Sequence, residues 1–159
     1  MQSRYGQSTD VYTAAQLAAT GLLAGQVYEV PNSPTRRMLV RNNPSGSSIL
    51  AGQAVMFTSG YANSFYVDAV TSGVPALGVN DNATTLHTGD TILVGYYFWV
   101  TIKGFAYPNV KTGTSANTLV CPCATAGALD TRTTTNQSNI MLLVANSTGS
   151  DAQKAAYIF

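Results

Sequence analysis

Apolar residues recur at every second position along the clearest ordered segment of the chain, residues 94–103. Because successive side chains of a β-strand point to opposite faces, this period predicts a strand with one core face. The predicted core face carries Val94, Tyr96, Phe98, Val100 and Ile102, and the second face carries Gly95, Tyr97, Trp99, Thr101 and Lys103. We expect the second face to meet solvent, another sheet or another subunit.

Eight more short segments are β-branched or aromatic in character and are bounded by Gly, Pro, Asn or Ser. They are Gln26–Val30, Arg36–Asn42, Gln53–Thr58, Ser64–Val70, Ala76–Val79, Thr118–Pro122, Ile140–Ala145 and Ala155–Phe159. Closely spaced short strands separated by turns are typical of a sandwich or barrel. The sequence therefore predicts an all-β, single-domain antiparallel fold, either a jelly-roll-like sandwich or a tulip-like barrel.

One segment departs from this pattern, and it lies near the N-terminus. Residues 9–25 are rich in Ala, which favours at most one short helix, with Ser8, Thr9 or Asp10 as its N-cap and Gly21 or Gly25 at its end. Extended structure competes with the helix because Val11, Tyr12 and Thr13 favour strands. Residues 1–10 have no apolar period, so we expect an extended N-terminal arm that folds only against a partner, followed by a single β domain over residues 11–159.

Two segments near the C-terminus are apolar on both sides of a predicted strand. In Ile140–Val144 both faces are apolar, which places this strand between two packed layers or at a subunit contact. The chain closes on Tyr157, Ile158 and Phe159. Because chain ends are normally polar and frayed, we expect this end to be tied down as a strand.

Composition points to a component of an assembly. Charged residues make up 9% of the chain, whereas soluble domains carry about 25%. Ser, Thr, Asn, Gln and Gly fill the intervals between apolar runs, so the surface is polar but nearly neutral. Because surface charge keeps free proteins soluble, a neutral surface is better explained if much of it packs against other copies or another protein. With 159 residues, the chain is long enough for one core.

Charge and hydropathy exclude two classes of partner. The formal net charge is +1, and the nearest approach to a basic cluster is Arg36, Arg37 and Arg41, which a strand would divide between its two faces. We therefore expect no nucleic-acid partner. The longest apolar run, residues 92–102, is far shorter than the roughly 20 residues that span a bilayer. With a polar N-terminus, this predicts no membrane partner and a protein that stays in the cytosol or leaves it by lysis.

Residues with catalytic or metal-binding chemistry are sparse. His87 lies in a polar, turn-like stretch, and the seven acids are spread evenly without a paired arrangement. Asn80, Asp81 and Asn82 with Asp90 weakly suggest calcium, but an Asn/Asp turn explains them more simply. Cys121 and Cys123 flank one proline, too far apart in an extended chain for an easy disulfide, and are interpreted as small buried hydrophobes. We expect no enzyme activity, no cofactor, no metal and no small-molecule substrate.

Residues 76–110 follow the cadence A-x-G-V, a polar loop, then G-Y-x-x-W-V-x-I-K-G, and ATAGALDT follows at 124–131. This cadence resembles that of the small head decoration, or capsid cement, proteins of tailed bacteriophages. The resemblance implies a β-rich virion protein on the outer surface of the capsid, made in the host bacterial cytoplasm. It also implies a homotrimer that binds the major capsid protein and stabilises contacts between its subunits.

Two groups of residues are candidates for the capsid or subunit contact. The first is the start of the arm, and the second is the aromatic pair of the clearest strand, because aromatic residues are favoured at interfaces. These candidates are Met1, Gln2, Ser3, Arg4, Tyr5, Tyr97 and Trp99. Packing of Tyr97 and Trp99 within the domain is an equal alternative. Two other functions stay open: a phage fibre, receptor-binding or carbohydrate-binding module, and a hydrolase assembled from His87, Asp81 and Asp90.

Overall fold

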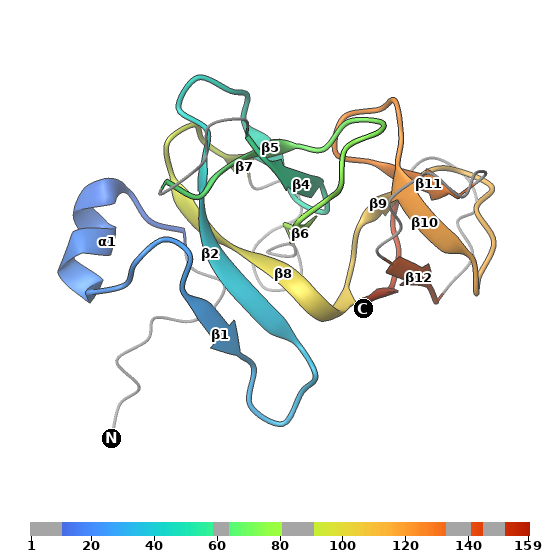
Figure 1. Ribbon diagram of the computed structural model, residues 1–159, viewed down its shortest axis with the longest axis horizontal. Coiled ribbons are helices and arrows are strands. Elements are labelled where there is room, and N and C mark those ends of the chain that lie inside the picture. The colour runs from blue at the N-terminus through green and yellow to red at the C-terminus, as the bar shows by residue number, and fades with distance from the viewer. Residues whose placement is uncertain (1–10, 59–63, 81–90, 133–140, 145–151) are drawn as a thin grey trace.

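A computed structural model describes residues 11–58, 64–80, 91–132, 141–144 and 152–159. It contains one short helix and many short strands (Figure 1). In chain order the elements are α1 Ala14–Thr20, β1 Val27–Glu29, β2 Arg36–Asn42, β3 Ile49–Leu50, β4 Ala54–Phe57, β5 Tyr66–Ala69, β6 Gly78–Val79, β7 Thr91–Ile92, β8 Tyr97–Ala106, β9 Asn109–Val110, β10 Leu119–Pro122, β11 Leu129–Thr131, β12 Met141–Leu143, β13 Ala152–Gln153 and β14 Ala156–Ile158. The predicted all-β domain with one short helix is confirmed.

The helix lies inside the segment where the sequence predicts it, but its cap is a different residue. Thr13 is the N-cap: its hydroxyl accepts a hydrogen bond from the Gln16 amide, and the Gln16 side chain accepts one from the Thr13 amide. This reciprocal pair satisfies two backbone donors that the first turn leaves unpaired. Gly21 ends the helix in a left-handed conformation with φ of 74°. The expectation of a cap at Ser8, Thr9 or Asp10 was wrong.

Five strands close a small barrel. The β2 strand pairs with β5 and β8, β5 with β4, β4 with β6, and β6 with β8, so every strand of this ring has two neighbours. A closed ring leaves no free edge within it. Its core consists of the fully buried side chains Val40, Val55, Val67, Phe98 and Val100, together with Ile49 and Ile92 of the small β3–β7 sheet.

A second sheet continues from the far end of β8. Residues Gly104 to Ala106 pair with β14, and the order continues through β12, β10, β11, β9 and β13. Two pairings are parallel, β2 with β5 and β9 with β11, and the other strand pairs of the described residues are antiparallel, as predicted. In Figure 1, α1 lies beside β1 and β2 at one end of the molecule, and β9–β12 lie at the other, with β8 running between them.

The barrel and the second sheet share one core. Ala54, Val70 and Val79 from the barrel pack with side chains of the second sheet, and all of them are buried. The second-sheet members are Ala106, Val110, Val120, Leu129, Met141, Leu143, Ala156 and Ile158. Backbone bonds cross the same junction: the Ala54 amide donates to the Gly127 carbonyl at 2.8 Å, and the Gly127 amide to the Val70 carbonyl at 2.8 Å. The two parts therefore pack as one domain.

The sequence pattern predicts which segments form strands better than it predicts the residues at which those strands begin and end. Where residues 94–103 predict the clearest strand, the observed strand is shifted three residues toward the C-terminus. Val94 and Gly95 form a turn in which Gly95 has φ of 79°, so Val94 is exposed rather than in the core. The C-terminal segment is tied down as β14, as predicted. Met141 and Leu143 of β12 are buried and Val144 is exposed, whereas Ile140 lies outside the described residues.

Gly104 is the point at which β8 meets the hairpin between β1 and β2. Its φ is +89°, and a Cβ atom there would lie 2.7 Å from Thr35 Cα and 3.0 Å from the Thr35 amide nitrogen. Such contacts are shorter than carbon and nitrogen atoms tolerate, and a left-handed φ is itself unfavourable for residues with a side chain. Only glycine therefore allows the hairpin turn to lie directly against β8.

Substituting Gly104 tests this junction. Gly113 is the matched control because it has φ of +87° and a Cβ atom added there would have nothing within 4 Å. Gly113→Ala should lower the free energy of unfolding by about 1 kcal/mol from backbone conformation alone. Gly104→Ala should cost a further 1–3 kcal/mol, roughly, from the steric contact with Thr35. Urea denaturation of both variants measures the difference. Equal losses of unfolding free energy would show that the hairpin is not in close steric contact with β8 at Gly104.

Candidate binding surface

Large aromatic side chains stand on the outer face of the second sheet, where β8 and β14 pair. Phe105 is 52% exposed, Tyr107 is 42% exposed and Phe159 is 63% exposed, while Tyr157 is half-buried. The alternating neighbours Ala106, Ala156 and Ile158 are buried in the core. We call Phe105, Tyr107, Tyr157 and Phe159 the aromatic strip.

Three rings of the aromatic strip hold one another in place. Tyr157 is opposite Phe105 in the β8–β14 register, and the two ring centroids are 5.2 Å apart with planes at 83°. The Tyr157 and Phe159 rings are 6.1 Å apart with planes at 67°. Edge-to-face packing of this kind is favourable for aromatic pairs because the positive ring edge meets the negative ring face. Phe105, Tyr157 and Phe159 therefore support one another rather than standing as independent side chains.

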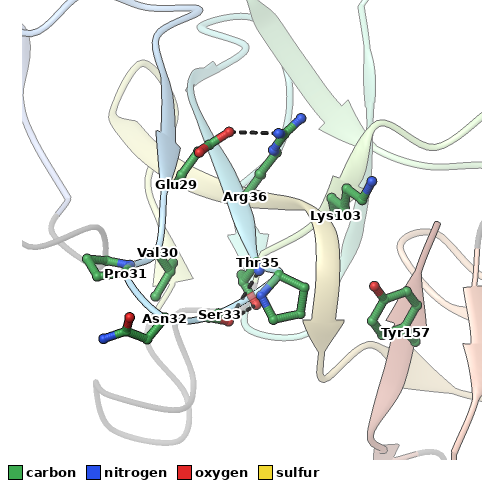
Figure 2. A pocket seen from close by; sticks show the side chains of 10 residues that line it. Glu29, Val30, Pro31, Asn32, Ser33, Thr35, Arg36, Lys103 and Tyr157 are labelled. Atoms are coloured by element: carbon green, nitrogen blue, oxygen red, sulfur yellow. Dashed lines mark hydrogen bonds and ion pairs between the residues drawn. The ribbon is translucent and has the colours of Figure 1, made fainter.

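A groove with a volume of about 660 Å³ adjoins the aromatic strip. One side is the hairpin between β1 and β2, and the other side is formed by Lys103 of β8 and Tyr157 of β14 (Figure 2). The hairpin contributes Glu29, Val30, Pro31, Asn32, Ser33, Pro34, Thr35 and Arg36. In Figure 2 the hydroxyl of Tyr157 lies on the side of the ring that faces Lys103 and the hairpin. Tyr157 thus belongs to both the aromatic strip and the groove.

The turn of the hairpin follows from its sequence. The Ser33 amide donates to the Val30 carbonyl at 3.2 Å, which closes a four-residue turn with Pro31 and Asn32 at its centre. Asn32 has φ of 58°. Proline presets the first central position of such a turn, and Asn is among the few residues that tolerate a positive φ at the second. The Ser33 hydroxyl then donates to the Thr35 hydroxyl at 2.9 Å, which fixes the remainder of the loop.

The groove carries a small positive charge. Arg36 and Glu29 form an ion pair at 2.7 Å on the hairpin, with half or more of each side chain exposed. This pair is electrically neutral and, being exposed, adds little stability. Lys103 has no ion-pair or hydrogen-bond partner among the residues that the structure describes. The unmatched charge of the groove is therefore the ammonium group of Lys103.

The aromatic pair predicted from the sequence is only partly on the surface. Trp99 is 2% exposed and packs with Tyr12, Leu17, Leu22 and Leu39 between α1 and the barrel. The Trp99 ring therefore contacts the N-terminal segment of its own chain. Of the two alternatives, a subunit contact or packing within the domain, the structure shows packing within the domain. Tyr97 is half-buried and packs against the same cluster.

Tyr97 pairs with Tyr12, which lies close to the start of the described residues. Tyr12 and Tyr97 form an isolated antiparallel bridge in which each amide donates to the other's carbonyl at 2.8 Å. Met1, Gln2, Ser3, Arg4 and Tyr5 lie outside the described residues. The structure thus places one predicted contact residue, Tyr97, beside Tyr12, and the predicted arm is not among the described residues.

Arg36 and Arg41 of the small basic cluster contact other residues of the chain. Arg36 pairs with Glu29, as above. The Arg41 guanidinium lies 5.2 Å from the Tyr66 ring centroid and 5.3 Å from that of Tyr97, and its Nε donates to the Gly95 carbonyl at 3.1 Å. A guanidinium between two aromatic faces is stabilised by the ring quadrupoles. Arg41 thus has a structural role within the described residues.

Most residues with candidate catalytic or calcium-binding chemistry lie outside the part of the chain that the structure describes. His87, Asp81 and Asp90 lie outside the described residues, and Asn80 is buried with its amide donating to the Leu50 carbonyl at 3.1 Å. Over the described ranges, no group of three His, Cys, Asp or Glu side chains is placed to hold a metal. The helix α1, the one helix placed there, does not have the length to cross a membrane.

Comparisons with known proteins give a likeness of fold. No protein-family model matches the chain, and no curated protein matches it. A solved structure, the head fiber gp8.5 N base of bacteriophage phi29, superimposes with a TM-score of 0.56 and 8% sequence identity. The match covers 77% of this chain and 92% of that one. At this identity the likeness shows that the two chains share a fold.

Sequence reasoning missed the aromatic strip because it ended the strand at Lys103. The signal that could have found it is the change of residue size after that point. From Gly104 onward, small residues at 104 and 106 alternate with Phe105 and Tyr107, so the larger side chains fall on the face that carries Lys103. An aromatic row opposite glycine and alanine indicates an outer face.

The two cysteines differ in exposure, which leads to a prediction about their reactivity. Cys121 is buried and Cys123 is half-buried, and both are free thiols. Burial, followed by the nearby carboxylate of Asp130, raises the pKa of the Cys121 thiol. Because the thiolate is the reactive form, Cys121 should react at least about tenfold more slowly than Cys123 with iodoacetamide at pH 8. Mass spectrometry of the labelled peptides, with Cys123→Ala as control, checks this, and equal labelling of both thiols in the folded chain would contradict it.

Proposed function

We propose that this chain is a non-enzymatic structural protein of a phage head that binds the major capsid protein at the outer surface. The observation that carries the proposal is the aromatic strip, in which Phe105, Tyr107 and Phe159 are exposed, on a fold like that of a phage head-fibre base. Exposed apolar patches of this kind mark protein interaction sites, and aromatic residues are favoured interface anchors. The occupant of the strip in this proposal is the capsid shell.

The mechanism is that of a cement. A protein that binds only where several mature capsid subunits meet stabilises the mature shell by mass action, because it favours that state over the others. As the resemblance to decoration proteins implies, the chain acts as a homotrimer. Three linked contacts gain avidity of roughly 10²–10⁴-fold over one, so each contact can be modest. The N-terminal arm, residues 1–10, adds a further contact with the shell or a neighbouring copy.

The low charge of the chain supports this role. Binding through an aromatic surface is most favourable where few charged groups must be desolvated. The chain has eight Lys and Arg against seven Asp and Glu, so its surface carries little net charge to repel or attract a shell. The proposal places the protein on the virion after synthesis in the host bacterial cytoplasm.

A second candidate is the base of a head fibre that carries a further module. The likeness to a head-fibre base favours it. Both candidates bind the head, but they differ in effect on the shell. A cement raises the temperature at which heads release DNA, whereas a fibre base leaves that temperature unchanged.

Binding to heads that lack the protein tests the role of the aromatic strip. The variant Phe105→Ser with Tyr107→Ser removes two exposed rings, and Leu93→Ser with Val94→Ser is the control because those side chains are similarly exposed, at 51% and 42%. The strip variant should bind at least about 30-fold more weakly in co-sedimentation, as expected for the loss of interface anchors. The control should bind like the wild type.

Three measurements accompany the binding assay. Light scattering of the free protein gives the oligomeric state, circular dichroism checks that both variants fold, and a DNA-release assay on heating separates a cement from a fibre base. Saturable binding at a fixed ratio to the major capsid protein supports the proposal. Full binding by the strip variant would remove the aromatic strip from the contact, and no binding by the wild type would overturn the proposal.

A further inference from the structure

We propose that the groove between the β1–β2 hairpin and Tyr157 binds an acidic glycan, that is, an oligosaccharide whose sugar rings carry carboxylate groups. This site goes beyond the capsid role, since it is built from Asn32, Lys103 and Tyr157, and Tyr157 is the one residue it shares with the aromatic strip. Loss of glycan binding and loss of head binding are therefore separate outcomes.

The first argument is the combination of an aromatic wall and a polar floor. A sugar ring has apolar C–H faces and hydroxyl groups around its rim, so it fits a site that offers an aromatic surface beside hydrogen-bonding groups. The Tyr157 ring supplies the aromatic surface and packs edge-to-face with Phe105 and Phe159. The hairpin side of the groove supplies Asn32, Ser33 and Thr35.

The second argument is that polar groups around the groove have no partner within the described part of the chain. The Asn32 amide, the Lys103 ammonium group and the Tyr157 hydroxyl make no hydrogen bond or ion pair there. Together they offer donors of three kinds and the acceptor oxygens of an amide and a phenol. Sugar hydroxyls need this mixture of donors and acceptors.

Charge selects an acidic ligand over a neutral one. The Glu29–Arg36 pair is neutral, so the ammonium group of Lys103 sets the charge of the groove. A carboxylate on the sugar would form a charge-assisted hydrogen bond with Lys103, and such bonds are roughly twice as strong as neutral ones. A neutral sugar of the same shape lacks this bond and leaves the lysine unmatched.

The hairpin is already ordered, which lowers the cost of binding. Pro31 and Pro34 restrict the loop, the Ser33 amide closes the turn on Val30, and the Ser33 hydroxyl is bonded to Thr35. The absence of a side chain at Gly104 lets Thr35 sit directly on β8. A ligand that binds an ordered loop loses less conformational entropy than one that must order it.

An NMR titration of the full chain tests the proposal with defined probes. The acidic probes are trigalacturonate, sialyllactose and a hyaluronan tetrasaccharide, and the neutral control is the methyl ester of trigalacturonate. At least one acidic probe should shift the amide signals of the hairpin and of residues 103–105 saturably, with a dissociation constant on the order of 1 mM for a shallow site. The methyl ester should bind at least about tenfold more weakly.

Variants locate the site with matched controls. Lys103→Gln and Asn32→Gly should each weaken binding, Lys103→Gln by about tenfold, because one charge-assisted bond is lost. Lys154→Gln and Tyr107→Leu, whose side chains do not line the groove, should bind like the wild type, whereas Tyr157→Leu should lose binding. Lys103 and Asn32 are exposed, so these two variants keep the test valid even if Tyr157→Leu unfolds.

Several results would overturn the proposal that the groove binds an acidic glycan. The proposal would be overturned if none of the acidic probes gave a saturable shift up to 10 mM, a concentration roughly ten times the expected dissociation constant. Equal binding of the methyl ester, or shifts that lie away from the hairpin, would also overturn it. If Lys103→Gln weakened head binding and no glycan bound, the groove would be a protein contact instead.

Discussion

One strand, β8, carries the constraint on which the rest of the structure depends. Its ten residues must complete the barrel with β2 and β6 and then begin the second sheet with β14. Even-numbered side chains of β8 face the core in both parts: Phe98 and Val100 lie in the barrel, and Ala106 lies in the core that the barrel shares with the second sheet. The odd-numbered face is covered at Trp99 and Thr101 but open at Lys103 and Phe105. This single alternation produces both the core and the candidate binding surface.

The boundary between the covered and open parts of the odd-numbered face separates what the sequence pattern of β8 could predict from what it could not. Alternation predicted correctly that the second face of the strand is distinct from the core face. It could not predict that Tyr12, Leu17 and Leu22 fold back over Trp99, because that contact joins segments about 80 residues apart in the chain. The same face continues uncovered at Phe105, two residues beyond the predicted end of the strand. Long-range packing, rather than local pattern, decides which aromatic residues are exposed.

Other features lay beyond local pattern for related reasons. The strands β3, β7, β9 and β13 have two residues each, and such short strands exist only through their tertiary pairing. The parallel pairing of β2 with β5 depends on how the barrel closes, which no period in the sequence encodes. By contrast, the turn at Pro31 and Asn32 and the helix cap at Thr13 follow from local chemistry. The groove could not be predicted, because it needs the hairpin, β8 and β14 together.

Cryo-electron microscopy of heads saturated with the protein tests the central claim most directly, because it shows which face of the chain meets the shell. The account predicts that Phe105, Tyr107 and Phe159 lie in contact with the major capsid protein and are covered by it. A reconstruction in which the chain is bound through another surface, with the aromatic strip facing solvent, would contradict it.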